Sequence, residues 1–148
     1  MRTKTPFCLL ILILSTLACN SALFATPTPV PTPTPIPVGT DLRSPLPPGD
    51  PVQGERLFSG QVNGQFACSS CHGVFAGQVT TCPNIVGLSA QAGARIPGYS
   101  AEQYLREAIV LPDAFVVEGY PAGVMPQNFG ELMTAQQLAD ILAYLMTK

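Results

Sequence analysis

The sequence contains few histidines and few charged residues, on which several classes of protein depend. Its 148 residues include one histidine, and only 11% of them are charged, with seven Lys and Arg against nine Asp and Glu. The few basic residues form no cluster, which argues against a nucleic-acid interface. No segment alternates apolar and polar residues as a half-buried strand does, so an architecture built on a β-sheet is not expected.

The single histidine, His72, directly follows a Cys-x-x-Cys pair made by Cys68 and Cys71. This five-residue string is the attachment site of a c-type haem, in which two thiols form thioethers with the vinyl groups and the histidine becomes an axial iron ligand. A thioredoxin-like redox pair would need a βαβ context. A zinc site could recruit Cys82, but adjacent Cys71 and His72 rarely converge on one tetrahedral ion. The pattern therefore predicts one covalently bound haem c.

The N-terminus predicts export and a lipid anchor. Residues 1–18 combine a short basic start with an apolar run that is too short to span a bilayer comfortably, as in a bacterial export signal. Residues 16–19 resemble a lipobox, so we expect Cys19 to be the lipidated N-terminus and Cys8 to be removed. Ordinary cleavage and an uncleaved anchor are the alternatives. The expected location is the extracytoplasmic (periplasmic) side of the cell membrane.

A proline-rich linker should separate this anchor from the folded domain. Residues 19–49 hold the lipidated terminus and a Thr/Pro-rich segment, in which proline occupies every second position of residues 26–37. Such a segment favours polyproline II geometry at about 3.1 Å per residue, which gives a spacer of roughly 37 Å, although a plain disordered linker is also compatible. The domain is then expected over residues 50–148.

Three helices are predicted within the domain. The first has Asp50 as N-cap, Pro51 at its first position and Gln53 as a reciprocal cap, and it ends near Gly60. Residues 73–98 and 113–132 lack helical periodicity, and we interpret them as loops. Loops of this length suggest that a large apolar cofactor organises the domain.

Capping boxes mark the other two helices. Ser100 with Gln103 begins one that Pro112 ends. Thr134 with Gln137 begins the last helix, which has the strongest apolar periodicity in the chain. That apolar face consists of Leu138, Ile141, Leu142 and Leu145, with Tyr144 beside it.

The second axial ligand cannot be histidine, because no other histidine exists. Met125 is the predicted ligand, since it lies in a loop and Pro126 restricts its backbone to extended conformations. Met133 and Met146 are the alternatives, and both are more easily core or surface residues. Thioether ligation opposite a histidine raises the reduction potential of a haem.

Together these features resemble class I cytochrome c over residues 50–148. The resemblance implies an all-α fold, with three or more helices around one haem c, in which the first and last helices cross near Gly54 and Tyr144. It also implies that the Pro83 carbonyl accepts the ring N–H of His72 and orients it. Cys82 stands where the family has a glycine, and we expect it to be a buried, inert thiol rather than a redox group.

A narrower resemblance covers residues 99–109 and 117–126, which are similar to mono-haem cytochromes of respiratory membrane assemblies, including the lipoprotein subunit of alternative complex III. It implies a non-enzymatic electron carrier in a quinol-oxidising respiratory or photosynthetic complex, with integral and multi-haem subunits and a redox protein as partners. An independent lipid-tethered shuttle is the alternative, and a haem sensor or enzyme with an open distal site is a remote one. Arg95 is a candidate partner of a haem propionate or a plain surface residue. Tyr120 and Asn128 flank Met125 and could hydrogen-bond near the haem edge.

Overall fold

The computed structural model describes residues 39, 41–78 and 80–148, all of which belong to one compact unit. In this part of the chain the secondary structure is helical, apart from one isolated bridge between Val62 and Gln65. The predicted all-α class is therefore confirmed. The predicted export signal, Cys19 and the Thr/Pro spacer lie outside the described residues. None of the described helices has the length and apolarity that crossing a bilayer requires.

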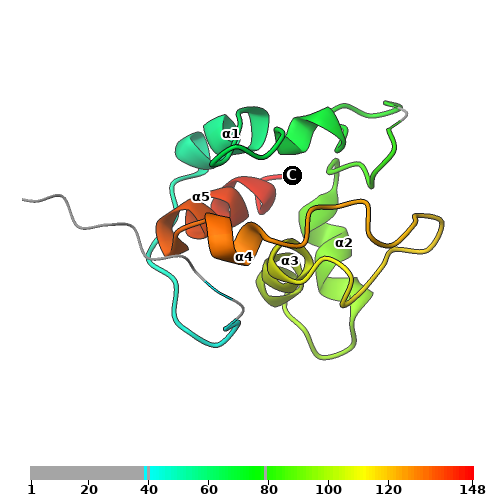
Figure 1. The fold of residues 1–148 in the computed structure, drawn as a ribbon. Coiled ribbons are helices and arrows are strands. Elements are labelled where there is room, and N and C mark those ends of the chain that lie inside the picture. Colours follow the sequence, from blue (N-terminus) through cyan, green and yellow to red (C-terminus); the bar gives the residue numbers. More distant parts are fainter. Residues whose placement is uncertain (1–38, 40, 79) are drawn as a thin grey trace, which may run out of the picture. The chain divides into compact units, whose positions relative to one another are not determined.

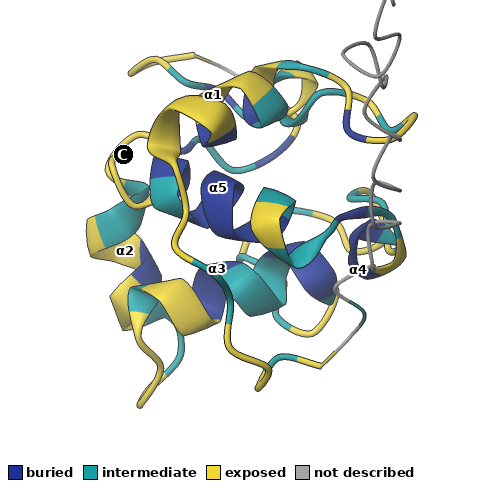
Figure 2. Cartoon of the chain, turned by 90° about the vertical axis from the view of Figure 1, so that its left-hand side faces the viewer, coloured by how far each residue is buried: buried dark blue, intermediate teal, exposed yellow. Residues whose placement is uncertain are grey.

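The helices follow one another in the order α1 (Pro51–Ser59), η2 (Cys68–Ser70), α2 (Leu88–Arg95), α3 (Ala101–Val110), α4 (Phe129–Leu132) and α5 (Ala135–Leu145). Helices α1 and α5, from opposite ends of the domain, lie side by side, and α2 packs against α3 (Figure 1). Helix α5 is largely buried, whereas the outer faces of α1 and α2 are exposed (Figure 2). The core thus gathers around α5.

Both predicted capping boxes are present. The Ser100 hydroxyl accepts from the Gln103 backbone N–H, and the Gln103 side chain accepts from the Ser100 backbone N–H. Thr134 and Gln137 make the same reciprocal pair at the start of α5. The predicted apolar face of α5 is buried at each of its four positions, as is Tyr144. Burying one large apolar side chain stabilises a fold by about 1.5–3 kcal/mol, so this helix is a major source of stability.

The cap of α1 differs from the prediction. The Asp50 carboxylate accepts from the Val52 N–H at 2.8 Å, but the Asp50 N–H donates to the carboxylate of Asp140 at 2.8 Å rather than to Gln53. Asp140 also accepts from Gln136 Nε2 at 2.8 Å, which satisfies a carboxylate in a residue only 6% exposed. A contact between the two ends of the domain therefore replaces the local reciprocal cap.

The crossing of α1 and α5 depends on Gly54. A Cβ atom at this position would lie 1.9 Å from the carbonyl oxygen of Asp140 and 2.7 Å from the Cβ of Tyr144. Only a residue without a side chain allows so close an approach of two helices. The predicted contact between Gly54 and the Tyr144 region is thus present.

Two of the segments predicted to be loops contain helices. Helix α2 lies within residues 73–98; its N-cap is Gly87, which has a left-handed backbone (φ 71°) and makes no side-chain cap, and only Ala92 is buried. With neither a polar cap nor an apolar stripe, this helix gives little periodic pattern. Helix α4 is a single turn within residues 113–132, too short to produce a pattern, and it buries Phe129 and Gly130.

Candidate functional site

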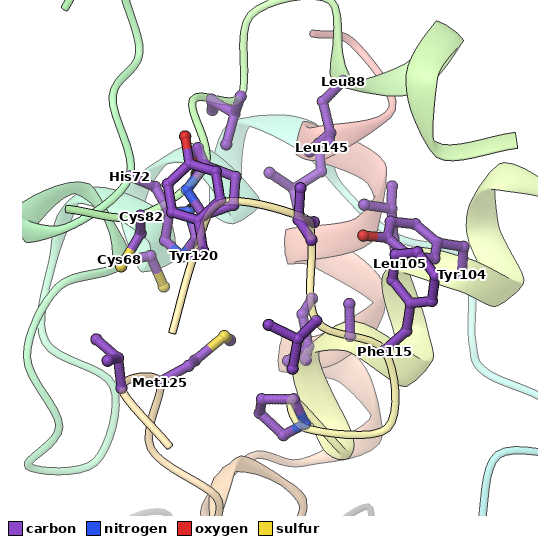
Figure 3. Close-up of a pocket in the computed structure, with 18 of the residues that line it drawn as sticks. Cys68, His72, Cys82, Leu88, Tyr104, Leu105, Phe115, Tyr120, Met125 and Leu145 are labelled. Atoms are coloured by element: carbon purple, nitrogen blue, oxygen red, sulfur yellow. Dashed lines mark hydrogen bonds between the residues drawn. The ribbon is translucent and has the colours of Figure 1, made fainter. Parts of the chain in front are cut away.

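A cavity that is open to solvent brings together residues from both of the segments that contain the predicted haem-binding side chains. Cys68 and His72 line it from the motif, and Met125 lines it from the loop before α4. Figure 3 shows His72 and Met125 reaching this hollow from different chain segments, with Cys68 near His72. Met125 lies 53 positions after His72 in the sequence, so it meets the motif only in the folded domain.

The haem motif begins with one turn of 3-10 helix, η2. The N–H groups of Cys71 and His72 both donate to the carbonyl of Cys68, at 3.1 and 2.9 Å. This turn places Cys68 in the cavity wall, where burial raises the pKa of its thiol, and leaves Cys71 exposed. Both thiols are free, as thioether formation requires.

The His72 ring is held in a fixed orientation. Its Nδ1 lies 2.8 Å from the carbonyl oxygen of Pro83, and because a carbonyl can only accept, Nδ1 carries the proton. The other ring nitrogen, Nε2, then has its lone pair free to bind a metal. Burial lowers the pKa of His72, which favours this neutral form, and the Pro83 contact opposes that shift. A carbonyl behind a ligating histidine also raises its basicity toward the metal.

The three methionines predicted as candidate axial ligands lie in different surroundings. Met125 is half-buried in the cavity wall, and its carbonyl accepts from Gln127 Nε2 at 2.8 Å. Met146 is 42% exposed and lines a different cavity. Met133 lines the haem cavity but is only 1% exposed, packed in the core before α5. Of the three, Met125 combines a position in the cavity with a loop location, which supports its assignment as the ligand.

The cavity lining suits a flat, mostly apolar group. Apart from the residues above, its walls come chiefly from α3, the loop after α3 and residues 81–88, with a smaller contribution from α5; they include Leu105, Phe115 and Leu145. Phe58 lies in the same wall, with its ring centroid 6.5 Å from that of His72 and 5.4 Å from that of Tyr144. Apolar and aromatic walls with a few placed polar groups are typical of cofactor sites. The residues present therefore fit a porphyrin whose iron is bound by His72 and Met125.

The polar groups of the cavity include Arg95, which the sequence offered as a candidate, and Tyr104, which sequence reasoning missed. Arg95 is half-buried in the cavity wall and donates to Gln91 Oε1 at 3.2 Å. Tyr104, expected only as a core residue of its helix, also lines the cavity, where burial raises the pKa of its hydroxyl and the Arg95 charge lowers it. The Tyr104 hydroxyl was the sequence feature that could have indicated this position, because a buried tyrosine usually needs a polar partner. Arg95 and Tyr104 are the candidate donors to a propionate.

Tyr120 and Asn128, which flank Met125 in the sequence, lie in different surroundings. Tyr120 lines the cavity, whereas Asn128 accepts a hydrogen bond from Gln65 Nε2 at 3.3 Å and is not among the lining residues.

Cys82 lines the cavity and is 7% exposed; burial and the neighbouring Cys71 thiol raise the pKa of Cys82. A buried thiol with a raised pKa is a poor nucleophile, which supports the inert role expected for Cys82. Within the described residues, no three His, Cys, Asp or Glu side chains are placed to hold a metal ion by themselves.

Comparison with known proteins gives two matches. The family model described as "Cytochrome c" matches residues 52–148. The curated protein "Cytochrome c2" of Rhodopila globiformis is 32% identical over 107 residues, which cover 68% of this chain and 95% of that protein. The family match covers every residue that lines the cavity.

Proposed function

Because this chain belongs to the cytochrome c family and so carries covalently attached haem c, we propose that it is a membrane-anchored single-electron carrier of a quinol-oxidising complex. The observation that carries the proposal is the cavity in which His72, held by Pro83, and Met125 meet around a largely apolar interior. When bound there, haem supplies a one-electron change between ferric and ferrous iron.

The roles of the residues follow from their positions. Cys68 and Cys71 would hold the cofactor covalently, and His72 and Met125 would bind its iron, which would leave no open site for a substrate. The apolar walls keep water away from the group, and a rigid, dry site limits the rearrangement that accompanies a change in charge. These features favour electron transfer over substrate chemistry.

Whether the ferrous iron binds an added ligand can be measured directly with carbon monoxide. Carbon monoxide should not bind to the native ferrous protein, because Met125 would already bind the iron on the side opposite His72. Spectra that change on addition of carbon monoxide would instead support a sensor or an enzyme with an open site.

The sequence supports the membrane anchor. Residues 16–19 offer Cys19 for lipidation, and the Thr/Pro-rich residues 26–37 would hold the domain away from the bilayer at about 3.1 Å per residue. The haem would then face the extracytoplasmic side, where covalent attachment in bacteria takes place.

Two arrangements are compatible with this anchor. In the first, the chain is a fixed subunit beside integral and multi-haem subunits, as in alternative complex III, which the similarity of residues 99–109 and 117–126 supports. In the second, it is an independent tethered shuttle to an oxidase or reaction centre, which the long spacer favours because its length increases the reach of the domain.

A native gel of membranes extracted in mild detergent, stained for haem, separates the two arrangements. Mass spectrometry of each haem band would identify the chains in it. A large band containing this chain with integral and multi-haem subunits supports the fixed subunit. A small band containing this chain alone rules out the fixed subunit and supports the shuttle.

A further inference from the structure

The two chain segments that bring haem ligands to the cavity carry no charged side chains. No Asp, Glu, Lys or Arg occurs in residues 57–94, which include the haem motif, or in residues 119–130, which include Met125. The charged residues that bound these segments are Arg56, Arg95, Glu118 and Glu131. These two segments therefore contribute no charged side chain to the surface beside the predicted thioether bonds.

Four large apolar side chains in these segments are exposed: Phe66 is 77% exposed, Phe75 73%, Val124 45% and Val86 42%. The first three lie within three residues of the haem motif or of Met125. Phe66 stands two residues before Cys68 and Phe75 three residues after His72, while Val124 precedes Met125 and lines the cavity. We call these three residues the apolar rim. Phenylalanine is usually buried, so two exposed phenyl rings beside one cofactor motif need an explanation.

Phe66 follows an ordered turn. The turn has left-handed backbone at Asn63 (φ 47°) and Gly64 (φ 89°), and it is closed by the Gln65 N–H donating to the Val62 carbonyl at 2.9 Å. Val62 is 1% exposed and so fixes the turn in the core. The Gln65 side chain donates to Asn128 at 3.3 Å, which ties the Phe66 segment to the segment that follows Met125.

Phe75 is held in a similar way. Its N–H and that of Val74 donate to Gln78 Oε1 at 3.4 and 3.0 Å, and its carbonyl accepts from Asn84 Nδ2 at 2.9 Å. Both phenyl groups therefore stand on backbone that is already ordered. Exposed aromatic groups on an ordered backbone lose little conformational entropy on binding, as is typical of interface anchors.

We propose that the apolar rim docks a redox protein whose own docking face is apolar and uncharged, an inference that rests on the proposed function. An uncharged face cannot steer a charged partner electrostatically, so complementarity here means apolar surface against apolar surface. A lipid surface is a poorer match, because aromatic residues that bind membranes are usually accompanied by Lys or Arg, and these segments contain neither.

The test is electron exchange between the full-length holoprotein and membranes from source cells that lack this chain, both in mild detergent. The second-order rate constant for oxidation of the ferrous protein is measured by stopped flow between about 20 and about 400 mM NaCl, a range over which charge steering is screened. We expect less than a twofold change with salt. The Phe66→Ser/Phe75→Ser double variant should react at least about tenfold more slowly, because interface anchors carry most of the binding energy.

Two controls isolate docking from folding and redox chemistry. Val52→Ser removes another exposed apolar side chain, 56% exposed on α1 and absent from the cavity lining, and should leave the rate unchanged. Ferricyanide, a small oxidant that needs no docking face, should oxidise the double variant and the unmodified protein equally fast.

Four outcomes would overturn the docking proposal. A steep fall in rate with salt would mean charged docking, and a double variant as fast as Val52→Ser would mean that the rim is not used. In the Cys19→Ala background, which removes the proposed lipid anchor, loss of sedimentation of the double variant with phosphatidylcholine vesicles, without loss of exchange rate, would make the rim a lipid contact. No exchange with the membranes at any salt, while ferricyanide still reacts, would contradict the proposed function as well.

Discussion

Replacement of Gly54 by alanine should strongly destabilise the domain. The new Cβ would lie 1.9 Å from the Asp140 carbonyl oxygen, and an ordinary contact begins near 3.4 Å, so α1 and α5 would have to separate by about 1.5 Å. The obstructing atoms belong to helix backbone, which cannot rotate away. Overpacking a core costs about 1–3 kcal/mol and occasionally more, and a clash with backbone belongs at the upper end, so we expect a loss of about 3 kcal/mol or more.

Guanidinium chloride unfolding of the holoprotein, followed by circular dichroism at 222 nm, measures this loss. The matched control is Gly93→Ala in α2, where a Cβ would lie 3.7 Å from its nearest neighbour and would meet no obstruction. That substitution should stabilise the domain by about 0.5–1 kcal/mol, because alanine has the higher helix propensity. A Gly54→Ala variant within 1 kcal/mol of the unmodified protein, with the same helical content, would refute the close-crossing argument.

Three further substitutions test the site and the anchor. His72→Ala should abolish stable low-spin haem, as followed by the visible absorption spectrum, and a normal spectrum would remove His72 as a ligand. Met125→Ala should lower the reduction potential and allow carbon monoxide to bind, because it removes the thioether that favours ferrous iron; an unchanged potential would transfer the role to Met133 or Met146. Cys19→Ala should move the protein from the membrane to the soluble fraction, and continued sedimentation with membranes would show that the N-terminal apolar segment or a partner holds it.

The sequence predicted those elements whose determinants are local. Ser100 and Thr134 indicate where their helices begin, because a capping box consists of residues within four consecutive positions. The buried face of α5 is visible in the sequence as a regular apolar repeat. The haem motif is equally local. Helix α2 escaped prediction because Gly87 caps it through backbone conformation, and because a helix that buries only Ala92 needs no apolar stripe.

The long-range features were harder to predict. The Asp50 N–H has a plausible local acceptor in Gln53, and only the folded domain reveals that Asp140 accepts it instead. Tyr104 was predicted as a core residue because its spacing fits the apolar face of α3, and nothing in that spacing indicates that its hydroxyl shares the cavity with Arg95. The Pro83 acceptor for His72 came from family resemblance, since eleven residues of irregular chain separate the two.

The contact between α1 and α5 also bears on the order of events during protein synthesis. Asp50 and Asp140 are 90 residues apart, so the first helix of the domain acquires its packing partner only when the last helix has been made. Contacts between such distant residues form late, because the long loop between them must close first. The domain therefore cannot complete its core before α5 is available, and Cys68 and Cys71 stay accessible until then to the machinery that attaches haem.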